Sequence, residues 1–193
     1  MVSRIELLSI EEAKANAARC GIRESMAPLS VYRALLKHPE LAVAVNHLLT
    51  MLLFTGNKLD VRLRELLIMR IGWVTGSVYE WTQHWRFAER VGIPAEDVLA
   101  VRDWRNTSRL SDADRAVLGA VDDTLSYGKI SDEVWRQCVA HVGGQEVLIE
   151  MVVAIGNWNT FSQLLRSLEI PLETGVECWP PDGMVPDLAK AGA

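Results

Sequence analysis

The sequence predicts an all-α fold. Two kinds of local signal support this prediction: residues that favour helix starts precede the apolar stretches, and Gly or Pro residues follow them. In addition, no stretch alternates apolar and polar residues with the period of two that a half-buried strand requires. A chain of 193 residues with 49% hydrophobic residues is long enough to bury a core, and the simplest expectation is a single domain.

The N-terminal part carries signals for three helices, which we predict over residues 10–20, 29–37 and 39–54. The first opens at a capping-box pattern formed by Ser9 and Glu12, and Gly21 ends it. The second follows a linker that contains Pro28. The third begins at Pro39, a residue suited to the first helical turn, and ends before a Gly-Asn break.

Two helices joined by a tight turn are predicted in the middle of the chain, over residues 61–75 and 77–91. Asp60 caps the first of them, whose apolar residues lie nearly all round the helix. Such a helix is buried, so we expect it at the centre of the fold. Gly76 separates the two helices and Gly92 ends the second.

The C-terminal part begins with a short helix from Pro94 to Val101, followed by a polar connection over 102–110. Ser111 and Ser131 then cap helices to Ser126 and His141, and a Gly-Gly turn leads to a long helix over 145–168. The predicted domain organisation is an N-terminal helix and linker over 1–27, a helical domain over 28–173, and an irregular C-terminal tail over 174–193.

Composition excludes several classes of function. The formal net charge of −5 argues against general nucleic-acid binding. No apolar run reaches the length of a membrane span, and the first residues lack a secretory signal, so we expect a cytoplasmic protein with no membrane partner. Cys20, Cys138 and Cys178 are odd in number and widely spaced, which indicates neither a disulfide framework nor a zinc cluster.

The chemistry is expected on the helix over 77–91. Ser77, Glu80 and His84 lie at i, i+3 and i+7, so they share one face of that helix. A carboxylate and an imidazole one turn apart form a pair suited to general acid–base catalysis. Glu65 lies on the preceding helix and can reach His84 across the tight turn, because both residues are a similar axial distance from it. We expect burial to lower the pKa of His84.

Each of these residues also has a structural interpretation. Ser77 and Glu80 fit a capping box, in which both side chains satisfy backbone N–H groups and Glu80 does no chemistry. A neighbouring Arg62 or Arg64 would be sufficient partner for Glu65. Trp81 and Trp158 either line a binding pocket or fill the core. Glutamate and histidine at i, i+4 is also a possible metal-ligand spacing.

The runs Leu63–Arg70 and Gly76–His84 resemble the carboxymuconolactone decarboxylase and alkylhydroperoxidase D superfamily, and the resemblance spans roughly residues 31–173. The peroxidase branch has a Cys-x-x-Cys-x-x-x-His helix and a glutamate on the helix before it. The resemblance places Glu65 on that glutamate, His84 on the histidine, and Ser77 and Glu80 on the two cysteines. The decarboxylase branch carries Glu-x-x-x-His, which Glu80 and His84 match.

The resemblance implies an orthogonal helical bundle of the alkylhydroperoxidase D-like type that forms a homo-oligomer: a dimer, trimer or hexamer. The apolar composition and the seven Trp residues also favour self-association. The resemblance implies no metal, and the reaction class that we expect needs no cofactor.

Peroxide reduction needs a reactive thiolate, and the motif has none. We therefore expect a lyase, decarboxylase or isomerase that uses acid–base chemistry on a small lactone or aromatic-derived acid. His84 would be the general acid/base, Glu80 its partner or the substrate-facing base, and Glu65 the orienting group. Ser77, Trp81 and Trp158 would contact the substrate. The alternative is a non-catalytic oligomeric or binding protein that has lost the peroxidase cysteines.

Overall fold

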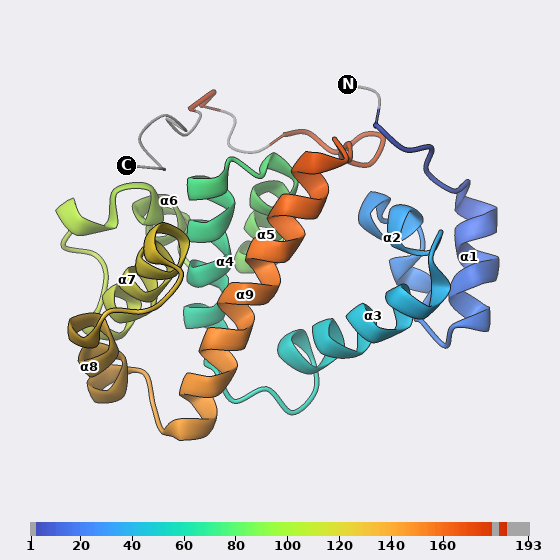
Figure 1. Ribbon diagram of the computed structural model, residues 1–193. Helices are drawn as coiled ribbons and strands as arrows, with labels where there is room; N and C mark the ends of the chain where they lie inside the picture. Colours follow the sequence, from blue (N-terminus) through green and yellow to red (C-terminus); the bar gives the residue numbers. More distant parts are fainter. Residues whose placement is uncertain (1–2, 179–181, 185–193) are drawn as a thin grey trace. The chain divides into compact units, whose positions relative to one another are not determined.

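The computed structural model describes residues 3–178 and 182–184, which form helices and no β-strand (Figure 1). The elements in chain order are α1 (Ile10–Arg19), η1 (Glu24–Met26), α2 (Ser30–Leu35), α3 (Pro39–Leu53), α4 (Val61–Thr75), α5 (Val78–Arg90), α6 (Ala95–Ala100), η2 (Val101–Asn106), α7 (Asp112–Tyr127), α8 (Asp132–His141) and α9 (Gln145–Ser167). The η elements are 3-10 helices. The predicted all-α fold is confirmed.

The chain divides into two compact units. Unit 1 comprises the residues up to Asn57 together with Leu164–Glu177, and unit 2 comprises Lys58–Gln163 and the described residues from Cys178 onward. The domain bounds predicted from the sequence stay a prediction. The predicted irregular tail is described over 174–178 and 182–184, where no helix or strand forms; its other residues lie outside the described part.

Unit 1 contains α1, η1, α2 and α3. The predicted capping box at the start of α1 is present, with the Ser9 and Glu12 side chains each accepting from the other's backbone N–H. The helix predicted over 29–37 is shorter than expected, since α2 ends at Leu35. Residues that precede a proline are pushed out of the helical region, and His38, which precedes Pro39, has φ −125° and ψ 84°.

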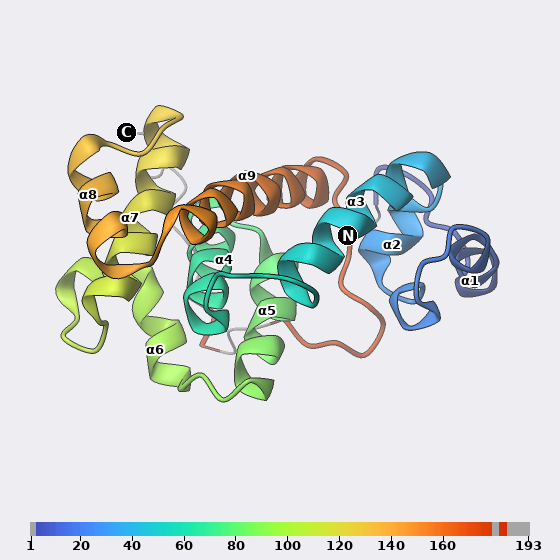
Figure 2. The same cartoon turned by 90° about the horizontal axis from the view of Figure 1, so that it is seen from below.

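The centre of unit 2 is the hairpin of α4 and α5 (Figures 1 and 2). Asp60 caps α4 as predicted, with its side chain accepting from the backbone N–H groups of Arg62 and Leu63. Gly76 ends α4 in the left-handed conformation, with φ 69°. The two helices approach closely at Gly72, where an added Cβ would lie 3.3 Å from the Trp81 backbone nitrogen. A glycine at this position lets the faces of α4 and α5 meet.

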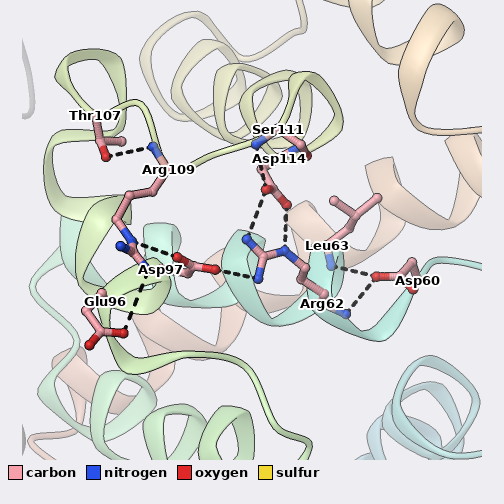
Figure 3. Close-up of polar contacts among 9 residues, drawn as sticks. All are labelled: Asp60, Arg62, Leu63, Glu96, Asp97, Thr107, Arg109, Ser111 and Asp114. Atoms are coloured by element: carbon pink, nitrogen blue, oxygen red, sulfur yellow. Dashed lines mark hydrogen bonds and ion pairs between the residues drawn. The ribbon is translucent and has the colours of Figure 1, made fainter.

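An ion-pair network fixes the N-terminal end of α4 against α6 and α7 (Figure 3). The Arg62 guanidinium lies between two carboxylates, with Nη1 2.9 Å from Asp97 Oδ2 and Nη2 3.0 Å from Asp114 Oδ2. Arg109 Nε donates to the other oxygen of Asp97 at 2.9 Å. Asp97 and Asp114 are both buried. Buried carboxylates are stabilised when they are paired in this way, so the network holds the helix that carries Glu65 one turn later.

The polar stretch after α6 is not only a connection, as its sequence predicts, because η2 occupies residues 101–106. Long-range contacts explain the difference. Arg70 Nη1 on α4 donates to the carbonyls of Val101 and Arg102 at 2.8 and 3.0 Å, and Trp104 Nε1 donates to Asp122 at 3.0 Å. These partners lie far away in sequence, so local pattern does not reveal them.

The first part of α9 is anchored beside the start of α4. Glu150 accepts from the backbone N–H groups of Lys58 and Leu59, at 2.6 and 3.1 Å. Trp158 follows about two turns later on the same helix, and this anchor therefore helps to set its position against α5. Within the described residues, no helix is long and apolar enough to cross a membrane.

Candidate active site

Glu65 is a fully buried carboxylate with two partners. Its side chain has an exposed fraction of 0%, and it lies on α4 facing α5. Arg64 Nε donates to Oε1 at 2.9 Å, and His84 Nδ1 lies 2.7 Å from Oε2. Two kinds of partner that the sequence offers for this buried carboxylate are therefore both present: the neighbouring Arg64 and a residue of the next helix. Arg62 is not a partner, because it binds Asp97 and Asp114.

His84 is held at both ring nitrogens. Its Nδ1 faces Glu65, and its Nε2 accepts a hydrogen bond from Trp158 Nε1 at 3.1 Å. The indole nitrogen can only donate, so Nε2 carries the lone pair and Nδ1 carries the proton that is donated to Glu65. The Trp158 ring meets the imidazole edge to face, with ring centroids 5.7 Å apart. These contacts fix the position of the imidazole and its neutral tautomer.

Glu80 lies beside the same Nε2 atom. Its Oε2 is 3.4 Å from His84 Nε2, one helical turn away on α5. This distance is longer than that of a well-formed hydrogen bond, roughly 2.7–3.2 Å. Burial raises the pKa of Glu80, the charge of His84 opposes this rise, and the charge of Glu65 adds to it. Glu80 therefore keeps its proton to a higher pH than an exposed glutamate does.

The pKa of His84 departs from the sequence prediction in direction. Burial by itself lowers it, as expected. The negative charge and hydrogen bond of Glu65, together with the charge of Glu80, outweigh burial, so the pKa of His84 is raised above its ordinary value. The prediction was wrong because it counted burial and not the two carboxylates on either side of the ring.

Ser77 precedes the first residue of α5 but does not cap the helix with its side chain. Its ψ of 90° differs from the 161° and 168° of Ser9 and Ser111, whose hydroxyls do cap. Ser77 is 1% exposed, and its Oγ has no hydrogen-bond partner among the described residues. Glu80 points to His84 instead of back to the cap. The capping-box interpretation of this pair is therefore wrong.

The six predicted site residues divide into two groups. Glu65, Glu80, His84 and Trp158 come together around one imidazole. Ser77 lies at the start of α5, and the Trp81 ring packs against that of Trp73 at an angle of 50°, with ring centroids 5.3 Å apart. The Arg102 guanidinium lies 5.5 Å from the centre of the Trp81 ring. Trp81 thus belongs to an aromatic and cationic cluster rather than to the group around His84.

One residue next to the site, Phe87, was not predicted from the sequence. Its ring centroid lies 6.4 Å from that of His84, and the Arg64 guanidinium lies 5.7 Å from the ring centre. Phe87 is three residues after His84 on α5, so helical spacing is the signal that could have identified it. It lies beside both partners of the buried Glu65 carboxylate, Arg64 and His84.

No cysteine lies at this constellation. Cys138 is buried on α8, its Sγ donates to the Ala116 carbonyl at 3.5 Å, and burial raises its pKa to about 11. Cys20 belongs to unit 1, and Cys178 is exposed beyond the last helix. A reactive thiol needs a lowered pKa and access, so Cys138 has the opposite properties.

The arrangement can move protons. Two carboxylates flank one imidazole at opposite nitrogens, and the Glu65–His84 pair resembles the orienting carboxylate and the histidine base of hydrolytic triads. The His84 side chain is 13% exposed and that of Glu80 8%, so solvent reaches both slightly. Because Glu65 and Glu80 face opposite sides of the ring, they do not form a shared set of metal ligands with His84.

Comparisons with known proteins give a matching family and solved structures with a similar fold. The model of the Carboxymuconolactone decarboxylase family matches residues 39–123, a range that contains Glu65, Ser77, Glu80 and His84. No curated protein matches the chain.

Three solved structures share the fold. A protein of unknown function from Agrobacterium tumefaciens, a candidate antioxidant defence protein AhpD, is 23% identical, covers 72% of this chain and 94% of its own, and has a TM-score of 0.65. The AhpD core of a peroxidase-related protein from Ralstonia eutropha is 10% identical, with coverages of 90% and 94% and a TM-score of 0.73. The debrominase Bmp8 in complex with 2,3,4-tribromopyrrole is 16% identical, with coverages of 90% and 94% and a TM-score of 0.69.

Proposed function

Because the chain belongs to the carboxymuconolactone decarboxylase and AhpD-like superfamily, we propose that it is an acid–base enzyme that transfers protons through His84. The observation that carries the proposal is the 2.7 Å contact between Glu65 Oε2 and His84 Nδ1, with Glu80 at the opposite nitrogen. The reaction class is a decarboxylation, lactone isomerisation or similar lyase step on a small lactone or aromatic-derived acid.

Each residue has a distinct role in the proposal. Glu65 holds the Nδ1 proton and stabilises the imidazolium that forms when Nε2 takes up a second proton. Glu80 exchanges a proton with Nε2 and with the substrate, and its raised pKa lets it keep a proton for donation to a higher pH than an exposed glutamate does. In a decarboxylation, the bond to the substrate carboxylate breaks, carbon dioxide leaves, and the carbon takes a proton from Glu80.

Redox chemistry is a weaker proposal for this chain, although two of the structural neighbours are described as AhpD proteins. Those neighbours are under 25% identical, so they support the fold and not the reaction. The residues supply the argument: Ser77 and Glu80 occupy the helix where the resemblance expects two cysteines. A serine hydroxyl does not become a thiolate or form a disulfide.

The test is a screen of lactones and aromatic-derived acids for carbon dioxide release, isomerisation, or solvent deuterium incorporation. We expect His84→Ala and Glu80→Gln to lower any turnover by roughly 10²–10⁴-fold, the usual size of a general acid–base contribution. Glu89→Gln is the matched control, since Glu89 is exposed on the same helix. Turnover that survives both site substitutions would refute the proposal.

A second candidate function is a non-catalytic oligomeric or binding protein. The observation that favours it is a row of exposed apolar side chains on α9: Ile149, Val152 and Val153 are 65%, 45% and 39% exposed. These residues are spaced i, i+3 and i+4, so they share one helix face. Light scattering at micromolar concentration should show a homo-oligomer, and a single monomer peak would remove the main support for this candidate.

A further inference from the structure

The Nε2 atom of His84 has two neighbours that cannot use it at the same time. Trp158 Nε1 lies 3.1 Å away and donates to it, and Glu80 Oε2 lies 3.4 Å away. A neutral imidazole has one lone pair at Nε2 and accepts the indole N–H there. A protonated imidazole has an N–H at the same place, which repels the indole N–H and needs an acceptor.

We propose that Trp158 is a positioning residue whose indole N–H holds His84 in the neutral tautomer. When Nε2 takes up a proton, its hydrogen-bond partner changes from Trp158 to Glu80. The site then has two arrangements. In the resting one, His84 is neutral and hydrogen-bonded to Trp158. In the charged one, His84 donates to Glu80 from Nε2 and to Glu65 from Nδ1. This inference deepens the proposed function, because it names the residue that sets how readily His84 accepts a proton.

The groups around the imidazole favour different charge states of the ring. From α4, the Glu65 carboxylate favours the charged ring, and Arg64, which is paired with that carboxylate, opposes it. From α5, Glu80 favours the charged ring. From α9, Trp158 presents an N–H that only the neutral ring can accept. Trp158 is 1% exposed, so solvent does not readily replace its acceptor when the ring becomes charged.

Trp158 carries no charge, and it still influences the proton affinity of His84. An uncharged side chain changes proton affinity here because it binds one protonation state and not the other. Trp158→Phe keeps an aromatic ring beside His84 and removes the N–H. It should therefore favour the charged imidazole. Glu80→Gln removes a carboxylate that favours the charged imidazole, so it should act in the opposite direction.

The experiment is a pH titration of the full-length protein by NMR, which follows the His84 imidazole and the Trp158 indole N–H together. In the wild-type protein, the indole signal should move with the same midpoint as the imidazole, and in His84→Ala this movement should disappear. Trp158→Phe should raise the His84 midpoint by about 0.5–1 pH unit, the equivalent of one ordinary hydrogen bond. Glu80→Gln should lower it. Trp135→Phe, at an exposed position on α8, is the matched control and should change nothing.

The proposal is overturned if the imidazole titrates while the indole signal stays fixed, or if Trp158→Phe leaves the midpoint unchanged or lowers it. It is also overturned if the ring keeps one charge state in both proteins between about pH 5 and pH 9. If Trp158→Phe does not fold, the wild-type indole titration decides by itself. None of these NMR measurements requires turnover. A failed search for a substrate would therefore refute the proposed function without affecting this test of the role of Trp158.

Discussion

Glu65 and His84 lie on consecutive helices, and their side chains meet with Oε2 and Nδ1 2.7 Å apart. Three features of α4 and α5 produce this contact: the left-handed turn at Gly76, the close approach at Gly72, and the similar axial distance of the two residues from the turn. The contact fixes which imidazole nitrogen carries a proton. It therefore connects the packing of the hairpin with the chemistry proposed for the site.

Replacing Glu65 should destabilise the fold. Glu65→Ala leaves the buried Arg64 guanidinium without its carboxylate, and removal of one partner from a buried pair costs on the order of 3–5 kcal/mol. Glu65→Gln should cost less, because the amide oxygen still accepts a hydrogen bond. Urea unfolding measures both, with Glu89→Ala as the exposed control on α5. A loss for Glu65→Ala no greater than that of the control would contradict the buried pair.

Two serines that precede helices should differ in their contribution to stability. Ser111 makes a complete capping box with Asp114, so Ser111→Ala should lower the free energy of unfolding by about 1 kcal/mol. Ser77 makes no side-chain cap and its buried hydroxyl has no hydrogen-bond partner among the described residues, so Ser77→Ala should leave the free energy of unfolding unchanged or raise it. Thermal or urea unfolding of the two variants tests this comparison. Equal losses would show that Ser77 caps α5 after all.

Stability should fall as pH rises across the neutral range. The pKa values of Glu80 and His84 are raised above their ordinary values of 4.5 and 6.5, so the folded state binds these protons more tightly than the unfolded state. The associated stability is fully present below those ordinary values and is lost as pH rises through the folded pKa values. Urea unfolding at a series of pH values should show a smaller decline for Glu80→Gln. Glu89→Gln should keep the wild-type slope; a wild-type curve that rises with pH would contradict the raised pKa values of Glu80 and His84.

The chain should show no thiol-dependent hydroperoxidase activity above that of free cysteine. The helix that would carry the reactive thiols has Ser77 and Glu80 instead, and the pKa of the buried Cys138 thiol is raised to about 11. The assay is reduction of an organic hydroperoxide with a dithiol donor. Robust turnover that Cys138→Ser or Cys178→Ser abolishes would overturn this prediction.

Local signals predicted most of the fold. Ser9, Asp60 and Ser111 cap their helices as the sequence indicates, and Gly76 ends α4 in the conformation that glycine favours. The 3-10 helix η2 was not predictable from its own residues, because its backbone carbonyls bind Arg70 from a distant helix. Ser77 shows the opposite limit of local sequence patterns: its sequence fits a cap, and its side chain makes none.

Spacing predicted the Glu65–His84 contact and the Glu80–His84 pair, because helical geometry and a short turn determine them. Two other properties depend on side-chain geometry that no spacing reveals. One is the hydrogen bond from Trp158, which comes from a helix more than seventy residues along the chain. The other is the balance of burial against two carboxylates, which reverses the expected direction of the His84 pKa shift.

The most direct test of the central claim is the nitrogen-15 NMR spectrum of the His84 imidazole, followed through a pH titration. A buried imidazole between Glu65 and Trp158 should be neutral at high pH with its proton on Nδ1, and its pKa should lie above the ordinary value of 6.5. A His84 ring that carries its proton on Nε2 when neutral, or whose pKa does not lie above 6.5, would contradict the proton-transfer site.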